Sequence, residues 1–308
     1  MIHYLRHHQI DFEQWDDCIN KSTIPLVYAK FWYLNTLTKN HWDALVLNDY
    51  EAVMPLCKKS KLGIEYLYQP IFAQQLGIFS KVGYSNSLIK EFITHIPKKF
   101  KFIDIQLNLK NDLLPKVNTI FVKENVNVEL SLNEPYTKLF SNYSDNLKRN
   151  LKKVYTQNLV LDFSLDFQPT IALFKKYKGL QYPEMQEHVY ENLAHILEIA
   201  ITKNCLKIVQ VKDKFSNSLL AGAFFLIDTQ RLIFLFSGIS EEGKQQRAMF
   251  YLLDTVIKEY ANSPKILDFE GSNDEQLARF YKGFGGKELK YFHLKINRLP
   301  AFLKWIKK

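Results

Sequence analysis

The stretch LDFEGSNDEQLARFYKGFGG, residues 267–286, places three of the chain's 11 glycines within its last four positions. Glycine occurs where the backbone turns through positive φ or where another molecule approaches the main chain closely. Ahead of these glycines, the residue pattern predicts a strand and then a helix at 273–282. Ser272 and Glu275 have the spacing of a capping box, which predicts that the helix begins at Asn273.

The predicted helix has one apolar face. Leu277, Phe280, Tyr281 and Phe284 recur at helical spacing, so we expect them to form a buried stripe. Gly283 follows the helix directly and is a predicted C-cap. A strand, a turn, a helix and a glycine-rich turn therefore follow one another in this stretch.

Hydrophobic spacing extends the prediction to the rest of the chain. In the second half, helices are predicted at 143–157, 168–180, 188–203 and 244–261, and strands at 205–212, 218–228, 231–239, 265–271 and 288–296. In the first half, strands are predicted at 2–6, 42–48, 51–59 and 101–107, an extended segment at 64–72, and helices at 11–20, 27–38 and 85–96. This is an α+β order used twice. We predict two α/β units, divided at a turn into residues 1–134 and 135–308.

Composition indicates a soluble globular protein, because 47% of the 308 residues are hydrophobic and 24% are charged. The longest apolar runs are too short to span a bilayer, and the N-terminus has no apolar core of a signal sequence, so we expect a cytoplasmic protein without an integral membrane segment. Cys18, Cys57 and Cys205 are far apart in the sequence, which predicts neither disulfides nor a metal site.

A net charge of +9 favours anionic partners, such as nucleic acid, nucleotide-linked substrates or an acidic membrane face. The alternative is a lysine-rich surface that is kept soluble by its charge. The segment 299–308, LPAFLKWIKK, is amphipathic and basic. We expect it to dock on its own domain, with a membrane surface as the alternative.

Several common catalytic motifs are absent from the sequence: GxSxG, HExxH and GxxxxGK[ST]. At 237–260 a strand end, a loop and a helix start follow one another, an arrangement that offers unpaired N–H groups to a phosphate. Acetyl-CoA-binding proteins of the GNAT type place a glycine-rich phosphate loop at this point. Here only Gly243 remains of that pattern, so CoA binding is disfavoured. Lys244 and Arg247 are the candidate donor-binding residues of the loop.

Two segments of the second half resemble the FemABX family of peptidyltransferases, which are double-GNAT proteins. The first is Asp268-Phe269-Glu270-Gly271 followed by FYKGFGG (280–286) and an aromatic strand, KYFHLKINRLP (290–300). The second, NLKRNLKKVYTQNLVLDF (146–163), is similar to the basic helix of that family. In the first half, YQPIFAQQLGIFS (68–80) is similar to uncharacterised relatives. The resemblance implies two GNAT-like units, each a mixed β-sheet flanked by helices.

Family members move an aminoacyl group from aminoacyl-tRNA to an amine of a cell-wall precursor. The resemblance therefore implies an acyltransferase without a bound cofactor, with tRNA as partner and an anionic nucleotide-linked or peptide acceptor, such as a peptidoglycan precursor. One alternative is a GNAT-type N-acyltransferase that uses acyl-CoA on a small amine or amino sugar. Another is a non-catalytic nucleic-acid- or nucleotide-binding module with the same fold.

The resemblance also implies roles for individual residues. The lysine of the family's glycine-rich segment contacts the acyl donor and stabilises the negative charge of the transition state, which assigns this role to Lys282. Phe280 and Phe284 would form the bottom of the acyl pocket, although their helical spacing favours packing in the core. Gly285 and Gly286 would let the donor approach the backbone.

Charged residues on two further elements are candidates. Lys148, Arg149, Lys152 and Lys153 form a basic stripe opposite an apolar helix face, suited to the phosphates of tRNA or a nucleotide sugar; a solvated surface is the alternative. Asp268 and Glu270 alternate on a predicted strand and so share a face. One of them would orient the amine or accept its proton, and a structural role at the turn is the alternative.

Overall fold

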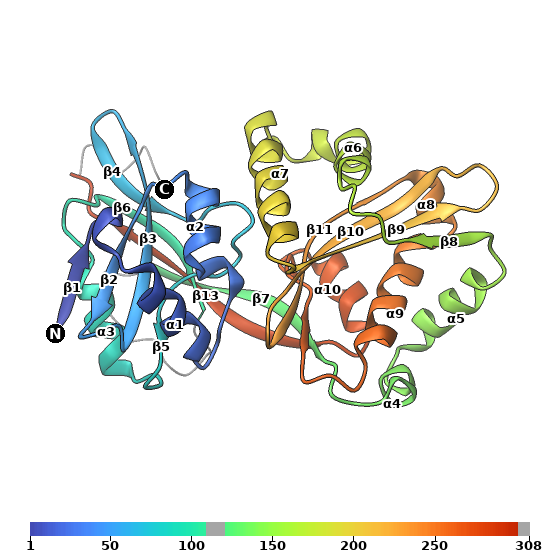
Figure 1. The fold of residues 1–308 in the computed structure, drawn as a ribbon, viewed down its shortest axis with the longest axis horizontal. Helices are drawn as coiled ribbons and strands as arrows, with labels where there is room; N and C mark the ends of the chain where they lie inside the picture. The colour runs from blue at the N-terminus through green and yellow to red at the C-terminus, as the bar shows by residue number, and fades with distance from the viewer. Residues whose placement is uncertain (109–120, 301–308) are drawn as a thin grey trace. The chain divides into compact units, whose positions relative to one another are not determined.

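A computed structural model describes residues 1–108 and 121–300, which fold into two compact units of helices and mixed sheet (Figure 1). The first unit comprises the described residues of Met1–Val126 and Lys290–Lys308, and the second comprises Asn127–Leu289. Strands β7 (Phe121–Ser131) and β13 (Lys287–Asn297) contribute residues to both units. The predicted division at residue 134 places all of β7 in the first unit and all of β13 in the second, and it stays a prediction. Most of the amphipathic C-terminal segment, from residue 301, lies outside the described residues.

The first unit has a sheet in the order β1-β2-β3-β4-β6-β13, with β5 also paired to β3. The β4–β6 pair is parallel and the other described pairs are antiparallel. Its remaining elements are β1 (Ile2–Leu5), η1 (His7–Gln9), α1 (Phe12–Lys21), η2 (Val27–Ala29), α2 (Phe31–Thr38), β2 (Trp42–Leu47), β3 (Ala52–Lys61), β4 (Ile64–Tyr68), β5 (Phe79–Ser80), α3 (Asn86–His95) and β6 (Phe102–Leu107).

Local chemistry defines where these helices begin. Asp11 accepts hydrogen bonds from the N–H groups of Glu13 and Gln14 and thereby caps α1. The helix predicted at 27–38 is instead a short 3-10 turn followed by α2, because Lys30 between them has an extended backbone with ψ 142°. Helix α3 buries Ile89 and Phe92 in the apolar core beneath the sheet.

The second unit has a sheet in the order β7-β12-β11-β10-β9-β8. Only the β11–β12 pair is parallel among its described pairs. Its other elements are α4 (Tyr136–Ser141), α5 (Asp145–Val154), β8 (Leu159–Asp162), α6 (Gln168–Tyr177), η3 (Gly179–Gln181), α7 (Glu187–Thr202), β9 (Leu206–Asp213), β10 (Leu219–Ile227), β11 (Arg231–Ile239), α8 (Glu241–Gln245), α9 (Ala248–Tyr260), β12 (Ile266–Asp268) and α10 (Glu275–Lys282).

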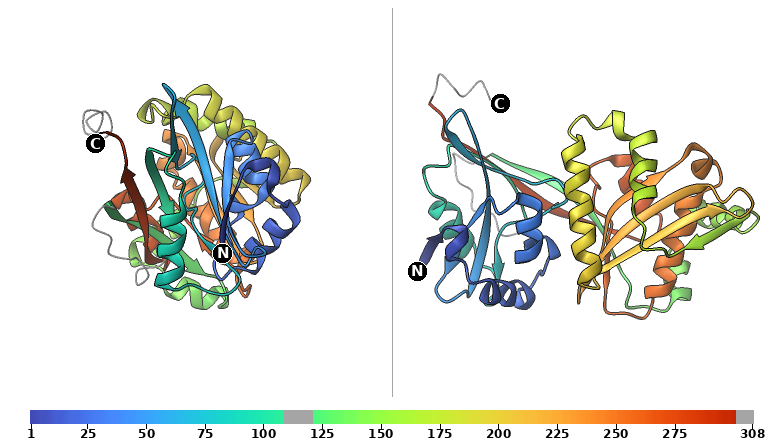
Figure 2. Two further views of the ribbon diagram at one scale, coloured as in Figure 1. Left: turned by 90° about the vertical axis from the view of Figure 1, so that its left-hand side faces the viewer. Right: turned by 45° about the horizontal axis from the view of Figure 1, so that its top comes forward.

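Helices cover both faces of this second sheet. Helices α6 and α7 lie on one face, and α5 and α9 lie on the other (Figures 1 and 2). Ala221 and Ala223 of β10 pack into the core beneath α9, whereas Gly222 between them faces α6. A Cβ on Gly222 would lie 2.1 Å from Thr170 Oγ1, so the glycine lets α6 approach the sheet closely. The α+β class with two mixed-sheet units is confirmed.

Three parts of the second unit differ from the prediction. The helix predicted at 244–261 is divided into α8 and α9 by Arg247, whose φ is 62°. Strand β12 ends at Asp268, three residues before the predicted end. Strand β8 was not predicted because it is short and only partly buried. Helix α4 was not predicted because it has only 6 residues. Strand β7 was not predicted either. None of the helices within the described residues has the length and apolar character that crossing a bilayer requires.

Candidate functional site

Strands β11 and β12 diverge in the middle of the second sheet. Their parallel pairing runs only from Arg231–Ile266 to Ile233–Asp268. Beyond it, Glu270 and Gly271 turn the chain away with φ of 49° and 56°, whereas β11 continues to Ile239. The edge of β11 beyond Ile233 thus lies outside this ladder. Unpaired peptide groups on a strand edge can hydrogen-bond a ligand that lies along them.

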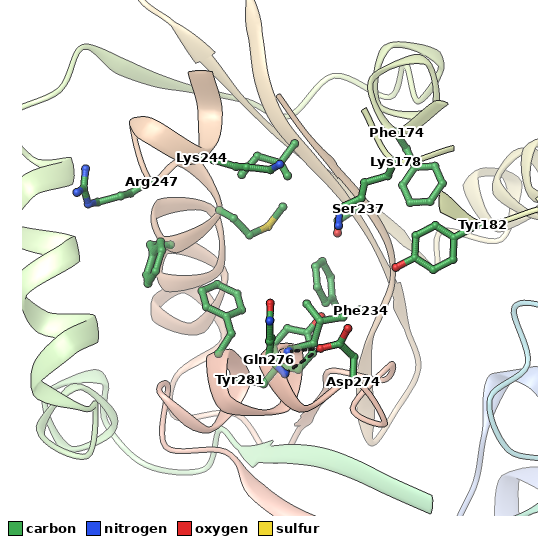
Figure 3. Close-up of a pocket in the computed structure, with 15 residues that line it drawn as sticks. Phe174, Lys178, Tyr182, Phe234, Ser237, Lys244, Arg247, Asp274, Gln276 and Tyr281 are labelled. Atoms are coloured by element: carbon green, nitrogen blue, oxygen red, sulfur yellow. Dashed lines mark hydrogen bonds between the residues drawn. The ribbon is translucent and has the colours of Figure 1, made fainter. Parts of the chain in front are cut away.

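A cavity of about 380 Å³ opens at this divergence, and we call it the splay cavity. Its walls come from β11, α6, α9 and α10 (Figure 3). Aromatic rings of Phe174, Phe234 and Phe280 line it, together with other apolar side chains. Ser237 and Gln276 are among the polar residues of the lining. An apolar cavity with a few polar groups is the usual form of a small-molecule site.

Three cations lie around the splay cavity: Lys178, Lys244 and Arg247. Arg247 is the N-cap residue of α9, and its guanidinium is turned away from the centre of the cavity (Figure 3). Its Nε donates to Asn150 Oδ1 at 2.7 Å and so ties α9 to α5. Lys244 is paired with the exposed Glu241. Lys244 and Arg247, the two loop residues predicted to bind the donor, therefore both line the cavity.

The phosphate loop expected before α9 is replaced by helix α8. Gly243, the remaining glycine of that pattern, lies inside α8 and is buried. A Cβ at this position would be 2.1 Å from the carbonyl oxygen of Leu220, which forbids any larger residue. Gly243 therefore serves close packing against β10.

Tyr281 brings a phenol to the splay cavity. It was predicted only as part of a buried apolar stripe, and its ring stacks on Phe269 with centroids 4.7 Å apart. Burial, followed by the charge of Glu270, raises the pKa of Tyr281 above its ordinary value. A phenol within an otherwise apolar stripe is the sequence signal that could have identified it.

Glu270 lies beside Tyr281; the residue is partly exposed and lines neither cavity, but one of its carboxyl oxygens is buried. Its Oε1 is fully buried and has no hydrogen-bond partner among the described residues. Burial raises the pKa of this carboxyl from 4.5 to about 8. A carboxyl with that pKa exchanges protons near neutral pH, as a general base or acid does.

Asp268 has the opposite environment, although it is only two residues away. Its Oδ2 accepts a hydrogen bond from Arg231 at 2.8 Å, and its Oδ1 accepts one from Asn127 at 2.9 Å. Arg231 also pairs with Glu129 at 2.7 Å. The expectation that Asp268 and Glu270 share a strand face is wrong, because the strand ends between them. Asp268 lines neither cavity, and its catalytic role stays a prediction.

Lys282 lines a second cavity of about 460 Å³, between α5 and α10, which we call the α5–α10 cavity. Its Nζ is 2.9 Å from Glu288 Oε2, and about half of each side chain is exposed. Phe250, Gln276 and Phe280 line both cavities, so they separate the two. Lys282 does not line the splay cavity, and its contact with a donor stays a prediction.

The glycine-rich turn is explained by the packing of the chain itself. Gly285 has φ 84°, a conformation that favours glycine. A Cβ on Gly286 would lie 2.5 Å from Val128 Cγ1. Phe284 is completely buried in the core, as its spacing favoured. These three residues line neither cavity, and their role toward a donor is untested.

The start of α10 differs from the predicted capping box. Asp274 is the N-cap, and its carboxylate accepts from the N–H groups of Gln276 at 2.8 Å and Leu277 at 3.0 Å. Ser272 instead donates to the carbonyl oxygen of Glu270 at 2.8 Å, which stabilises the turn. Leu277, expected to be buried, is 37% exposed and faces the splay cavity.

The basic stripe lies on α5 opposite its buried residues, as predicted. Arg149, Lys152 and Lys153 are exposed, and Lys148 donates to the carbonyl oxygen of Ser141 at 2.8 Å. The phosphate-binding role of these residues stays a prediction. Within residues 1–108 and 121–300, no three His, Cys, Asp or Glu side chains are grouped as metal ligands would be.

Comparison with known proteins identifies the fold. A search against protein-family models and a search of curated protein sequences find no match. Among solved structures, FemX matches with a TM-score of 0.71 over 97% of this chain and 99% of its own, at 12% identity. The chain has the double-GNAT fold of FemX.

Two further solved structures have this fold. A tandem GNAT protein from the clavulanic acid biosynthesis pathway matches 98% of the chain and 100% of its own, with a TM-score of 0.52 and 8% identity. L-PGS from Bacillus licheniformis matches 96% of the chain and 95% of its own, with a TM-score of 0.55 and 11% identity. The fold resemblance inferred from residues 268–286 is confirmed.

Proposed function

We propose that the protein is an acyltransferase and that the reacting end of its acyl donor binds in the splay cavity. One observation carries the proposal: the cavity combines an open strand edge with the Tyr281 phenol, and Glu270, which has a buried carboxyl oxygen, lies next to that phenol. Donors of hydrogen bonds and a group that exchanges protons near pH 8 are what acyl transfer to an amine requires. The FemX fold agrees with this chemistry.

In the proposed reaction, the amine nitrogen of the acceptor attacks the carbonyl carbon of the donor ester. Peptide N–H groups on the edge of β11 stabilise the negative charge that develops on the carbonyl oxygen. The amine proton passes through Tyr281, which lines the cavity, to the Glu270 carboxylate next to it. The carbon–oxygen bond of the ester then breaks, and Tyr281 donates a proton to the leaving oxygen. An amide and an alcohol result. The proton held by Glu270 then passes to the Tyr281 oxygen, so both residues return to their starting protonation states.

We propose aminoacyl-tRNA as the donor, in preference to acyl-CoA. Gly243 packs against β10, and helix α8 occupies the place of a phosphate loop. The residues at this position therefore do not form a glycine-rich loop that would hold the CoA pyrophosphate. The cations around the splay cavity and the basic face of α5 suit a larger polyanion. The acceptor would be an amine, with a peptidoglycan precursor as its proposed class. A tRNA donor implies a cytoplasmic reaction.

The test is acyl transfer by the purified protein. Charged tRNA and acetyl-CoA are each supplied with a peptidoglycan precursor that has a free side-chain amine, and amide formation is measured. We expect transfer from charged tRNA and a drop of roughly a hundredfold for Tyr281→Phe. Tyr177→Phe, which alters a tyrosine outside the cavity lining, is the matched control. Transfer from acetyl-CoA alone would replace the tRNA proposal, and equal rates for Tyr281→Phe and wild type would contradict the assignment of the site.

A further inference from the structure

Strands β3 and β4 of the first unit form a hairpin whose end extends beyond its neighbours in the sheet (Figure 1). Among the described pairs, β3 is paired with β2 as far as Cys57, and β4 is paired with β6 from Tyr66 onward. The last two pairs of the hairpin, next to its turn, therefore extend past both neighbours. We call residues 59–66 the β3–β4 arm.

The turn of the arm contains a leucine where the backbone disfavours one. Leu62 and Gly63 have φ of 51° and 75°, so both central residues of this two-residue turn are left-handed. Asn-Gly is a preferred pair for such a turn, because asparagine tolerates the left-handed region. Leu62 is 93% exposed, so it gains almost nothing from packing within the chain. A leucine that is both strained and exposed is costly for the fold, which favours a contact outside the chain.

Lysines and aromatic residues share one face of the arm. Lys59 is opposite Tyr66 and Lys61 is opposite Ile64, and the side chains of opposite residues lie on the same face. The Nζ of Lys59 lies 4.1 Å from the centroid of the Tyr68 ring, two residues further along β4. Both lysines are exposed. This face and the leucine at the tip therefore combine positive charge with apolar and aromatic surface.

The carboxylates near the base of the arm are paired with other lysines. Glu65 lies on the opposite face of the arm, and its carboxylate is 3.4 Å from Lys99 Nζ. Asp43 is buried and pairs with Lys58 at 2.6 Å. The two exposed lysines of the arm therefore keep their positive charge available to an external anion.

We propose that the β3–β4 arm docks on an anionic lipid surface, with Leu62 entering the lipid and Lys59 and Lys61 contacting the headgroups. An exposed leucine is stabilised when it leaves water for an apolar medium. Lysines are attracted to an anionic leaflet, and tyrosines concentrate at membrane interfaces. A second copy of the arm is a poor occupant, because the like charges of the two arms repel. RNA would engage the lysines but leave the leucine in water.

The test is sedimentation of the full chain with lipid vesicles. Vesicles of phosphatidylcholine with about one-third phosphatidylglycerol are compared with vesicles of phosphatidylcholine alone, and RNA binding is measured separately. We expect the anionic vesicles to bind at least about tenfold more tightly than the neutral ones. The double variant Lys59→Gln/Lys61→Gln should weaken this binding about tenfold or more, because both lysines contribute to the attraction.

The variant Leu62→Asn separates docking from folding. It supplies the preferred Asn-Gly pair, so its free energy of unfolding should equal or exceed that of wild type. Binding to anionic vesicles should nevertheless fall about tenfold, because the apolar tip is lost. Leu180→Asn, at a leucine of the second unit that is 98% exposed, is the matched control and should change binding by less than about twofold.

Three outcomes would overturn the proposal: no preferential binding to anionic vesicles, equal binding by Leu62→Asn and wild type, or equal losses for the arm lysine variant and Lys203→Gln/Lys214→Gln. The last variant removes two exposed lysines of the second unit, and equal losses would show that affinity comes from the net charge of the chain. RNA binding that depends on the arm lysines, without vesicle binding, would assign the arm to a nucleic acid instead. Vesicle binding needs no acyl donor, so failure of the proposed function would leave this result unchanged.

Discussion

The end of β12 and the turn that follows it place two carboxyls two residues apart in opposite environments. Asp268 is buried but compensated by Arg231 and Asn127. Glu270 has a buried carboxyl oxygen without a partner among the described residues, and its pKa is raised to about 8. The difference teaches that burial alone does not indicate function. A buried charge with partners stabilises the fold, whereas one without partners is costly and is retained where it has a chemical task.

The largest expected effect is a loss of stability when the ion pair of Asp268 with Arg231 is broken. Arg231→Ala removes the cation from both Asp268 and Glu129, which lie at 2.8 Å and 2.7 Å. Breaking a buried ion pair by removing one partner costs about 3–5 kcal/mol, so the free energy of unfolding should fall by that amount in urea denaturation. Lys290→Ala, which removes an exposed partner of Glu124, is the control and should cost less than about 1 kcal/mol. Equal losses for the two variants would contradict the structural role of the network.

Glu270→Gln should instead raise the free energy of unfolding relative to wild type, and this gain should appear only at higher pH. The folded protein keeps a proton on Glu270 up to a pKa of about 8, whereas the unfolded chain releases it near 4.5, so stability falls as pH rises through this interval. Glutamine has no such proton to lose. Relative to wild type, the variant should therefore gain on the order of 3 kcal/mol in unfolding free energy between pH 5 and pH 8.

The measurement is urea denaturation of both proteins at pH 5 and pH 8. Glu288→Gln changes an exposed carboxyl, and its stability should stay within about 0.5 kcal/mol of wild type at both pH values. If the difference between Glu270→Gln and wild type is the same at both pH values, the buried carboxyl does not titrate as described.

The smallest expected effect concerns the turn that separates the two carboxyls. Gly271 has φ 56° and open space around its Cα, so Gly271→Ala adds backbone strain and no clash. We expect a loss of about 1–2 kcal/mol in unfolding free energy. Gly63→Ala is a matched control, because Gly63 has φ 75° and is equally open, in the first unit. Both variants should lose similar stability, but only Gly271→Ala should also slow acyl transfer, since it displaces Glu270.

The sequence was sufficient to predict most of the elements around the site. The apolar spacing of α9 and α10 located both helices, because an amphipathic helix repeats over several turns. The start of α10 was predicted two residues too early. Ser272 and Asp274 both have capping chemistry, and only the structure shows that Asp274 accepts the two N–H groups.

The environment of each carboxyl could not be predicted. Asp268 is paired with Arg231, 37 residues away in the sequence, and with Asn127, which is 141 residues away. Sequence spacing carries no information on such distant contacts. The alternation DFE indicated a continuing strand, but the left-handed backbone of Glu270 directs its side chain elsewhere. The sequence does not indicate the second cavity, because Arg279 lies beside an apolar stripe and matches no binding motif.

The most direct test of the central claim is the pH dependence of acyl transfer by wild type and Glu270→Gln. The rate for wild type should rise with pH and level off above an inflection near 8, as the carboxyl of Glu270 loses its proton. In Glu270→Gln the rate should fall by roughly a hundredfold or more, and this inflection should disappear. An unchanged rate and the same inflection in Glu270→Gln would contradict the claim that the reaction takes place in the splay cavity with the help of the carboxyl behind Tyr281.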